Sequence, residues 1–178
     1  MNIEIRKETP QDYYETEEMT RRSFYNLHGP GCDEHLLVHK LRTHKDYLPE
    51  CSRVAVVDGK IAGTIMYFKC MIRGAKEDVT IASFGPLCVD HKYKNCGIGR
   101  KLLEATIPLA KAAGFPGIVI FGEPYYYPKF GFKRGREFGL TDMEGNASDA
   151  FMGLELVEGG LQIAGGRFEE SSVVEELT

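Results

Sequence analysis

Apolar positions along the first quarter of the chain change from strand-like alternation to helical spacing. Ile3 to Lys7 alternates as a short strand. Thr9-Pro10-Gln11-Asp12 follows as an N-cap with proline at the first helical position, which predicts a helix to about Phe24. After Gly29-Pro30-Gly31, leucines at helical spacing predict a second helix from Asp33 to about Lys45. This part should therefore hold one strand and a helical pair.

The middle of the chain is rich in β-forming residues. Two such runs between Arg53 and Phe68 are joined by Asp58-Gly59, which is the strongest short signal of a hairpin. A third run, Val79 to Phe84, continues through Gly85-Pro86 into Leu87-Cys88-Val89. Proline donates no ladder hydrogen bond, so Gly85-Pro86 predicts a bend or bulge. We expect consecutive antiparallel strands here.

The remaining periodic segment is a helix followed by further strands. One apolar stripe predicts a helix from Ile98 to Ala113, ended by Gly114 and bent at Pro108; the stripe consists of Ile98, Leu102, Ala105, Leu109 and Ala113. Downstream, the pattern predicts these elements: a strand at Ile118 to Phe121, a short helix or turn through Tyr125 to Tyr127, and closing strands at Phe151 to Leu156 and Leu161 to Ile163.

Length and composition indicate an ordinary globular protein. The 178 residues, with 43% hydrophobic and 27% charged side chains, fit one domain, which we assign to residues 1–168. Residues 169–178 carry four glutamates and are interpreted as a frayed acidic tail. The net charge of −4 argues against nucleic acid as a partner.

The location of the protein is inferred from its cysteines and its apolar runs. The five cysteines are odd in number and lack C-x-x-C pairs, which favours reduced thiols in a cytosol. No apolar run approaches the length that spans a bilayer, and the amino-terminus does not have the pattern of a signal peptide. We therefore expect a cytoplasmic protein without a membrane partner.

The segment from Leu87 to Leu103 carries the clearest chemistry. An apolar strand ending in Leu87-Cys88-Val89 runs through a short glycine-bearing turn straight into a helix. A helix start has unpaired N–H groups and a partial positive charge, and glycines let an anion approach the backbone. The cationic residues around this turn are Lys92, Lys94, Arg100 and Lys101. A pyrophosphate would suit the site, whereas a Walker loop and the dinucleotide fingerprint are both excluded because position 102 is Leu.

Two motifs carry a family resemblance. Lys94-Asn95-Cys96-Gly97-Ile98-Gly99, read as [KRQ]-x-x-G-x-G after its strand, resembles the acetyl-coenzyme A loop of the GNAT N-acetyltransferases. Tyr127 to Phe132 resembles the family's second signature, Y-x-x-x-G-F, and with Gly122-Glu123-Pro124 and Phe84 to Leu87 it is most similar to the YhbS-like branch. Lys94 departs from the commoner Arg or Gln, and Asn95-Cys96 departs from the usual basic and polar pair.

The resemblance implies a fold and an activity. The fold is α/β (α+β), with a GNAT-like, mixed, mostly antiparallel central sheet flanked by helices on both faces. The activity is transfer of an acetyl group from acetyl-coenzyme A to a primary amine of a small molecule or protein, by direct attack in a ternary complex and without a metal. A homodimer is the default for the family and is therefore possible here. The alternative is a non-catalytic sensor or regulatory module that binds acyl-coenzyme A.

The resemblance also implies roles for particular residues. The backbone N–H groups of one run would hold the pyrophosphate, with Lys94 and Arg100 as charge partners; the run is Asn95, Cys96, Gly97, Ile98, Gly99 and Arg100. The backbone of Leu87, Cys88 and Val89 would pair with the pantetheine amides.

The proton donor to the leaving thiolate is predicted to be Tyr127, which matches the family's acid. Tyr127 could instead only pack under the cofactor, or Tyr125 or Tyr126 could take its role. Glu123 is a weak candidate for the base that deprotonates the amine, and a helix-capping role is the simpler interpretation.

Two further observations concern metal binding and the charge of the acceptor. His35 and His39 have the spacing of metal ligands on a helix, but no HExxH pattern or acidic ligand set completes a site. The sequence does not identify the acceptor amine, although the acidic balance of the chain favours a cation.

Overall fold

The computed structural model describes residues 1–177, which form two compact units, each built from several segments of the chain. The first unit contains residues 1–67, 85–109 and 173–177. The second unit contains residues 68–84 and 110–172.

The strands of the first unit follow the alternating runs of the sequence. β1 (Ile3–Arg6) pairs antiparallel with β2 (Arg53–Val57), which turns into β3 (Lys60–Arg73). Asp58 and Gly59 have φ angles of 50° and 78°, the left-handed conformations of a two-residue hairpin turn. The predicted hairpin is therefore confirmed, although β3 runs past its predicted end at Phe68.

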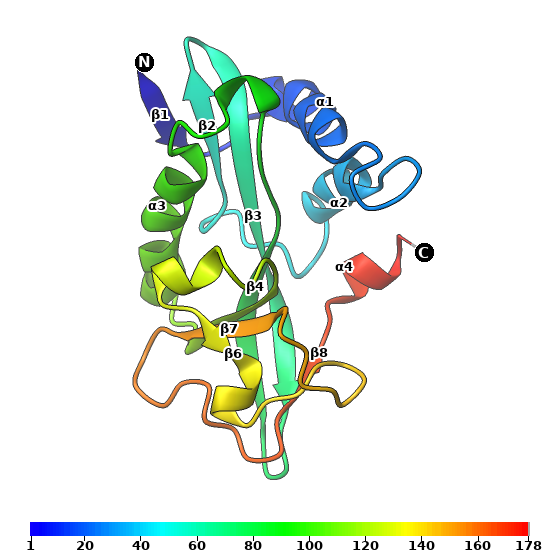
Figure 1. Cartoon of the computed structure of the whole chain (residues 1–178), viewed down its shortest axis with the longest axis vertical. Helices are drawn as coiled ribbons and strands as arrows, with labels where there is room; N and C mark the ends of the chain where they lie inside the picture. The colour runs from blue at the N-terminus through cyan, green and yellow to red at the C-terminus, as the bar shows by residue number, and fades with distance from the viewer. Residues whose placement is uncertain (178) are drawn as a thin grey trace. The chain divides into compact units, whose positions relative to one another are not determined.

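Helices cover both sides of the strands in this unit. A 3-10 turn, η1 (Pro10–Asp12), leads into α1 (Tyr13–Phe24), with Thr9 as N-cap and Pro10 first in the turn, as predicted. Figure 1 shows α1 and α2 (Glu34–Leu41) on one side of the strands and α3 (Ile98–Ala112) on the other. The prediction that the second helix reaches Lys45 is wrong. The helix ends at Leu41 because the N–H groups that follow donate to carbonyls only three residues back.

The buried face of α3 differs from the predicted stripe. The fully buried positions are Ile98, Leu102, Leu103, Thr106 and Ala110, whereas Ala105 and Leu109 are half-buried and Ala113 is exposed beyond the helix end. The reason is that a polar residue occupies a core position. Thr106 donates to the Leu102 carbonyl at 2.7 Å and lies 2.9 Å from the Tyr67 hydroxyl, so its buried oxygen is satisfied. Thr106 therefore faces the core.

The second unit is built around short strands. Its strands are β4 (Asp78–Val89, with residues from 85 on in the first unit), β5 (Gly117–Phe121), β6 (Lys133–Arg134), β7 (Phe151–Glu155) and β8 (Arg167–Glu169). β5 pairs with β7 and β7 with β6, all antiparallel, and β8 pairs antiparallel with β3. Two 3-10 turns, η3 (Tyr127–Phe130) and η4 (Gly135–Phe138), lie between β5 and β7 in the chain. β5 and β7 confirm two of the predicted strands.

Two predictions near the carboxyl end differ from the structure. Leu161 to Ile163 is not a strand but part of a turn, in which Leu161 and Ile163 are still buried. Their apolar side chains pack without ladder bonds, and β8 forms later. The segment interpreted as a frayed tail begins within β8 and contains α4 (Ser172–Glu175). Val173 is buried and anchors this segment to the protein. The interpretation as a frayed tail considered only the glutamates and did not take this apolar residue into account.

The strand order of the sheet is β1-β2-β3-β4-β5-β7-β6, and β8 lies beside β3. β4 and β5 are parallel and pair at Ala82 and Ile118, ahead of Gly85-Pro86, whose peptide bond is cis. A mixed, mostly antiparallel sheet with helices is the predicted fold class. No helix within residues 1–177 is long and apolar enough to cross a membrane.

Candidate functional site

The turn that follows β4 is held by Asp90. The Asp90 N–H donates to the Ala62 carbonyl at 2.8 Å, and its carboxylate accepts from the Lys92 N–H and from Arg22, both at 3.0 Å. Burial pushes the pKa of Asp90 up, but the Lys92 N–H and the Arg22 guanidinium together hold that pKa below its ordinary value. The carboxylate therefore stays charged and fixes where the chain leaves β4 for η2 (His91–Tyr93).

The backbone between η2 and α3 is shaped to present N–H groups. Asn95 and Gly97 have φ angles of 61° and 80°, in the left-handed region that favours glycine. The Gly97 carbonyl accepts the Lys101 N–H at 3.0 Å, so Gly97 is the N-cap of α3. Within residues 1–177, the N–H groups of residues 95–99 make no hydrogen bond. Such unpaired donors at a helix start are a binding site for an anion.

The side chains around this loop add charge. Lys94 and Arg100 are exposed, and Arg100 contacts Glu104 at 3.4 Å one turn along α3. Cys96 is half-buried, with its thiol 3.5 Å from the Lys94 carbonyl. The loop therefore combines backbone donors with exposed cationic side chains.

The preceding strand segment has a buried centre. Leu87 and Val89 are half-buried, whereas Cys88 is 7% exposed and packs against Met19 and Thr20 of α1, with both contacts at 3.7 Å. Burial raises the pKa of the Cys88 thiol to about 12. Cys88 is thus a packed thiol rather than a nucleophile, because the thiolate is the reactive form.

Tyr127 lies in the second unit within a group of aromatic rings. Its ring centroid is 5.1 Å from Tyr126, 5.6 Å from Phe132 and 5.9 Å from Phe84. Burial raises the pKa of the Tyr127 phenol well above its ordinary value, and Tyr126 raises it further. No residue in the range 1–177 makes a hydrogen bond to its hydroxyl. The phenol stays protonated at neutral pH and is available as a donor.

The neighbouring candidates are placed differently. Tyr125 is 85% exposed, and Tyr126 packs on Phe130 with the Lys129 ammonium 5.1 Å from its ring centroid. Glu123 is exposed, and its backbone carbonyl, not its carboxylate, accepts the N–H groups of the next turn. Tyr127 is in contact with both Phe84 and Phe132.

The two histidines with metal-like spacing face separate partners. His35 Nδ1 lies 3.6 Å from the Cys32 sulfur, and His39 Nδ1 lies 2.6 Å from a Glu17 oxygen. Across the described part of the chain, no three His, Cys, Asp or Glu side chains are grouped to hold a metal. The spacing of these two residues therefore reflects ordinary polar contacts of α2.

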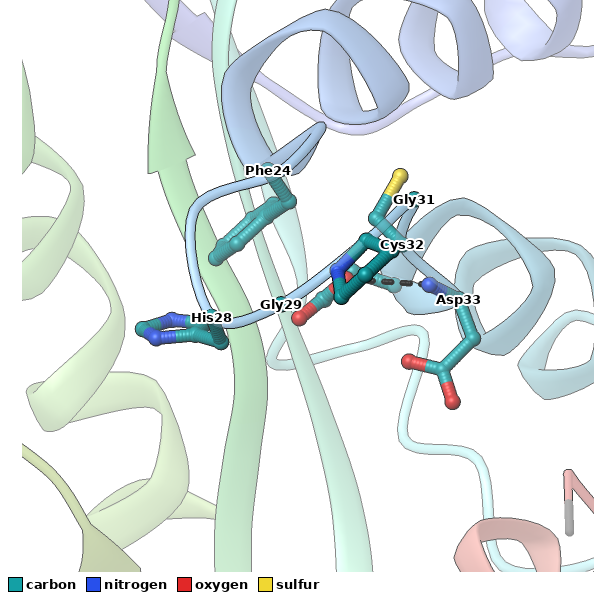
Figure 2. A pocket seen from close by; sticks show the side chains of 8 residues that line it. Phe24, His28, Gly29, Gly31, Cys32 and Asp33 are labelled. Atoms are coloured by element: carbon teal, nitrogen blue, oxygen red, sulfur yellow. Dashed lines mark hydrogen bonds between the residues drawn. The ribbon is translucent and has the colours of Figure 1, made fainter.

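A pocket of about 350 Å³ opens on the loop between α1 and α2. Figure 2 shows Phe24 and His28 on one side of the pocket and Cys32 and Asp33 on the other. Glu34 also belongs to the lining, which holds two carboxylates and, among the described residues, no lysine or arginine. Such a lining favours a positively charged ligand.

The family model of the acetyltransferase (GNAT) family matches residues 12–132, which include both the loop ahead of α3 and Tyr127. The chain belongs to the GNAT family. It is 32% identical over 130 residues to the uncharacterized N-acetyltransferase YhbS of Escherichia coli K12, covering 72% of each chain.

Solved structures of GNAT proteins match almost the whole chain. YhbS from Escherichia coli in complex with CoA matches with a TM-score of 0.84 and 26% identity, over 98% of this chain and 93% of that chain. A GNAT family acetyltransferase from Brucella melitensis in complex with acetyl-CoA matches with a TM-score of 0.76 and 26% identity, over 97% and 98%. The GNAT fold class and the N-acetyltransferase class predicted from the sequence are confirmed.

Sequence reasoning missed two residues that shape this GNAT site. Asp90 directly follows a strand and precedes a turn, which is the usual place of a capping carboxylate, so its capping role could have been predicted from the sequence. Arg22, its partner from α1, is 68 positions away and carries no local signal.

Proposed function

We propose that this GNAT protein transfers the acetyl group of acetyl-coenzyme A to a primary amine of a small molecule or protein, by direct attack in a ternary complex. The observation that carries the proposal is the row of unpaired N–H groups at residues 95–99, ahead of α3. The relatives from Escherichia coli and Brucella melitensis, whose structures contain CoA and acetyl-CoA, support the same donor.

The cofactor is held mainly by backbone. The N–H groups of Asn95 to Arg100 bind the pyrophosphate, with the Lys94 and Arg100 side chains as charge partners. The backbone of Leu87 to Val89 pairs with the pantetheine amides as an added strand. The donors are already fixed by the turn, so little ordering is needed on binding.

Tyr127 completes the reaction as a proton donor. The amine nitrogen bonds to the thioester carbonyl carbon and the carbon–sulfur bond breaks, and the sulfur takes the phenolic proton of Tyr127. The cationic amine loses one proton to water before it attacks and a second as the amide forms, and water returns a proton to the Tyr127 phenolate. Burial keeps the phenol neutral before the step, which supports this role.

The acceptor is a cationic amine in this proposal. The pocket between α1 and α2 supports it, because Asp33 and Glu34 line the pocket without a neighbouring cation in the lining. We also propose one GNAT domain over residues 1–168, a cytoplasmic location, which the five free cysteines support, and a possible homodimer.

Calorimetric titration with acetyl-coenzyme A tests the cofactor site. We expect micromolar binding by the native protein and at least about tenfold weaker binding by Gly97→Val, because a side chain there is strained at a φ of 80° and would stand between the anion and the backbone N–H groups. Gly145→Val is the matched control, since Gly145 has a φ of 82° in an exposed loop of the second unit. No binding by the folded native protein, or equal loss in both variants, contradicts the assignment.

Thiol release from acetyl-coenzyme A, measured with spermidine, a lysine-containing peptide and a peptide with a free α-amine, separates an enzyme from a sensor. A sensor binds the cofactor but releases no thiol with any amine. Tyr127→Phe is expected to lower kcat at least about tenfold while leaving the affinity for acetyl-coenzyme A unchanged. Unchanged turnover removes the role assigned to Tyr127.

A further inference from the structure

Gly122 lies directly against the ring of Tyr127. A Cβ built on Gly122 would be 2.8 Å from Cδ2 of that ring, 3.4 Å from Cζ, and closer still to Cε2. Carbon atoms in contact normally lie about 3.5–4.0 Å apart. The edge of the ring that leads to the hydroxyl therefore rests on the bare Cα of Gly122.

Neighbouring groups constrain both partners of this contact. Gly122 is tied to the sheet, because its N–H donates to the Ala150 carbonyl at 2.9 Å, just ahead of β7. The Tyr127 ring is bounded on other sides by the rings of Phe84, Phe132 and Tyr126. Any side chain at position 122 must push the Tyr127 ring out of its present place.

The requirement for glycine comes from space, not from backbone strain. The left-handed residues of the described chain do not include Gly122, so alanine suits its backbone conformation. A substitution there tests the position of the ring alone.

We propose that Gly122 is a positioning residue for the acetyl transfer: the absence of a side chain at this position sets where the Tyr127 hydroxyl stands. The inference rests on the proposed function of Tyr127 as the acid. A donor must be within hydrogen-bond reach of the sulfur it protonates, and a displacement of about 1 Å can cost on the order of a hundredfold in rate. Glycine at this position keeps that geometry.

Gly135 offers a matched control in the same unit. A Cβ on Gly135 would be 2.5 Å from Cε2 of Phe151 and closer to Cδ2, so Gly135→Ala forces a similar overlap with a ring. Gly135 is likewise outside the left-handed region, and the ring of Phe151 packs on those of Phe121 and Phe168. Both alanine variants should lose similar stability, but only Gly122→Ala should affect the chemistry.

The first test needs no acceptor. In protein labelled with ¹³C-tyrosine, Tyr127→Phe identifies the Tyr127 ring signals. We expect Gly122→Ala to shift these signals more than those of any other tyrosine, and Gly135→Ala to leave them in place. Unshifted Tyr127 signals in a folded Gly122→Ala protein would overturn the inference whatever the fate of the proposed function.

The second test is kinetic, with the best amine of the three named above, or with slow hydrolysis of acetyl-coenzyme A if none reacts. Gly122→Ala should lower kcat at least about tenfold with the KM for acetyl-coenzyme A within about twofold, and Gly135→Ala should leave both unchanged. In a Tyr127→Phe background, Gly122→Ala should lower kcat by less than about twofold. If Gly122→Ala lowers kcat equally in that background, Gly122 does not act through Tyr127. Full activity of Tyr127→Phe itself would refute the role of Tyr127 as the acid, but not the placement of its ring by Gly122.

Discussion

Replacing Asp12 with asparagine is expected to lower the free energy of unfolding by about 2 kcal/mol at pH 7. The Asp12 carboxylate closes the start of the first helix, and its side chain is 12% exposed. It accepts two hydrogen bonds from Arg6, at 2.7 and 3.0 Å, and two from Thr9, at 2.8 Å from the N–H and 2.9 Å from the hydroxyl. Asparagine keeps the shape but loses the charge that these donors recognise.

The magnitude follows from the pKa of Asp12. Arg6 lowers this pKa from 3.8 to about 2, with help from the two Thr9 donors and against the opposing effect of burial. One pH unit is worth about 1.4 kcal/mol, so this lowering corresponds to about 2 kcal/mol. Because the folded pKa is the lower one, the stabilisation is complete above the unfolded pKa near 4 and is lost as the pH falls through about 2.

Urea unfolding of the native protein and Asp12→Asn at pH 7 and pH 3 tests this account. The difference in unfolding free energy should shrink at pH 3 to about half its value at pH 7, because the carboxyl of the unfolded chain is then mostly protonated while that of the folded protein is still mostly charged. Asp149→Asn is the control: its side chain is 61% exposed in an ion pair with Arg136 at 2.7 Å, so its effect should be much smaller. An equal difference at both pH values would refute the electrostatic explanation and leave only altered packing.

Three further predictions concern the core and the cofactor loop. Tyr67→Phe should cost about 1 kcal/mol in urea unfolding, since the Thr106 hydroxyl 2.9 Å away keeps its bond to the Leu102 carbonyl; a cost above about 3 kcal/mol would contradict this. Gly63→Val should weaken acetyl-coenzyme A binding in calorimetry, because even a Cβ there lies 3.0 Å from the Cys88 oxygen and from Ile98 at the start of α3. Unchanged affinity would show that packing at position 63 does not affect the cofactor loop. N-ethylmaleimide should label Cys96 and Cys32 in the folded protein but spare Cys51 and Cys88, where burial raises the pKa to about 11 and about 12; acetyl-coenzyme A should slow labelling of Cys96 alone, as read by peptide mass spectrometry.

The elements that were predictable from sequence are those set by local rules. The hairpin at Asp58-Gly59 and the start of the first helix at Thr9-Pro10 depend on conformations that few residue types adopt, so the residue types alone predict them. The loop ahead of α3 was readable for the same reason. Its glycine carries a positive φ that a turn into a helix requires.

The misses arise where tertiary partners decide. Thr106 lies in the core because Tyr67 and the Leu102 carbonyl satisfy its hydroxyl, and no pattern along α3 reveals a partner on β3. Leu161 and Ile163 are both buried with an exposed residue between them, which is the alternation expected of a strand. They nevertheless lie outside the strands, so this alternation led to a wrong prediction. The contact of Gly122 with Tyr127 likewise depends on how the chain folds back after β5.

The proposed site obtains both of its chemical properties from the backbone and from burial rather than from net charge. The left-handed conformations of Asn95 and Gly97 expose unpaired N–H groups that attract an anion, and burial raises the pKa of Tyr127 and so keeps its proton in place. Neither property requires a basic protein, which is why a chain of net charge −4 is compatible with a polyanionic cofactor. The same reasoning explains why Lys94 can replace the usual Arg or Gln, since the side chain assists donors that the backbone already supplies. Conservation of geometry around the loop and around Gly122 therefore matters more to this mechanism than the number of cations near it.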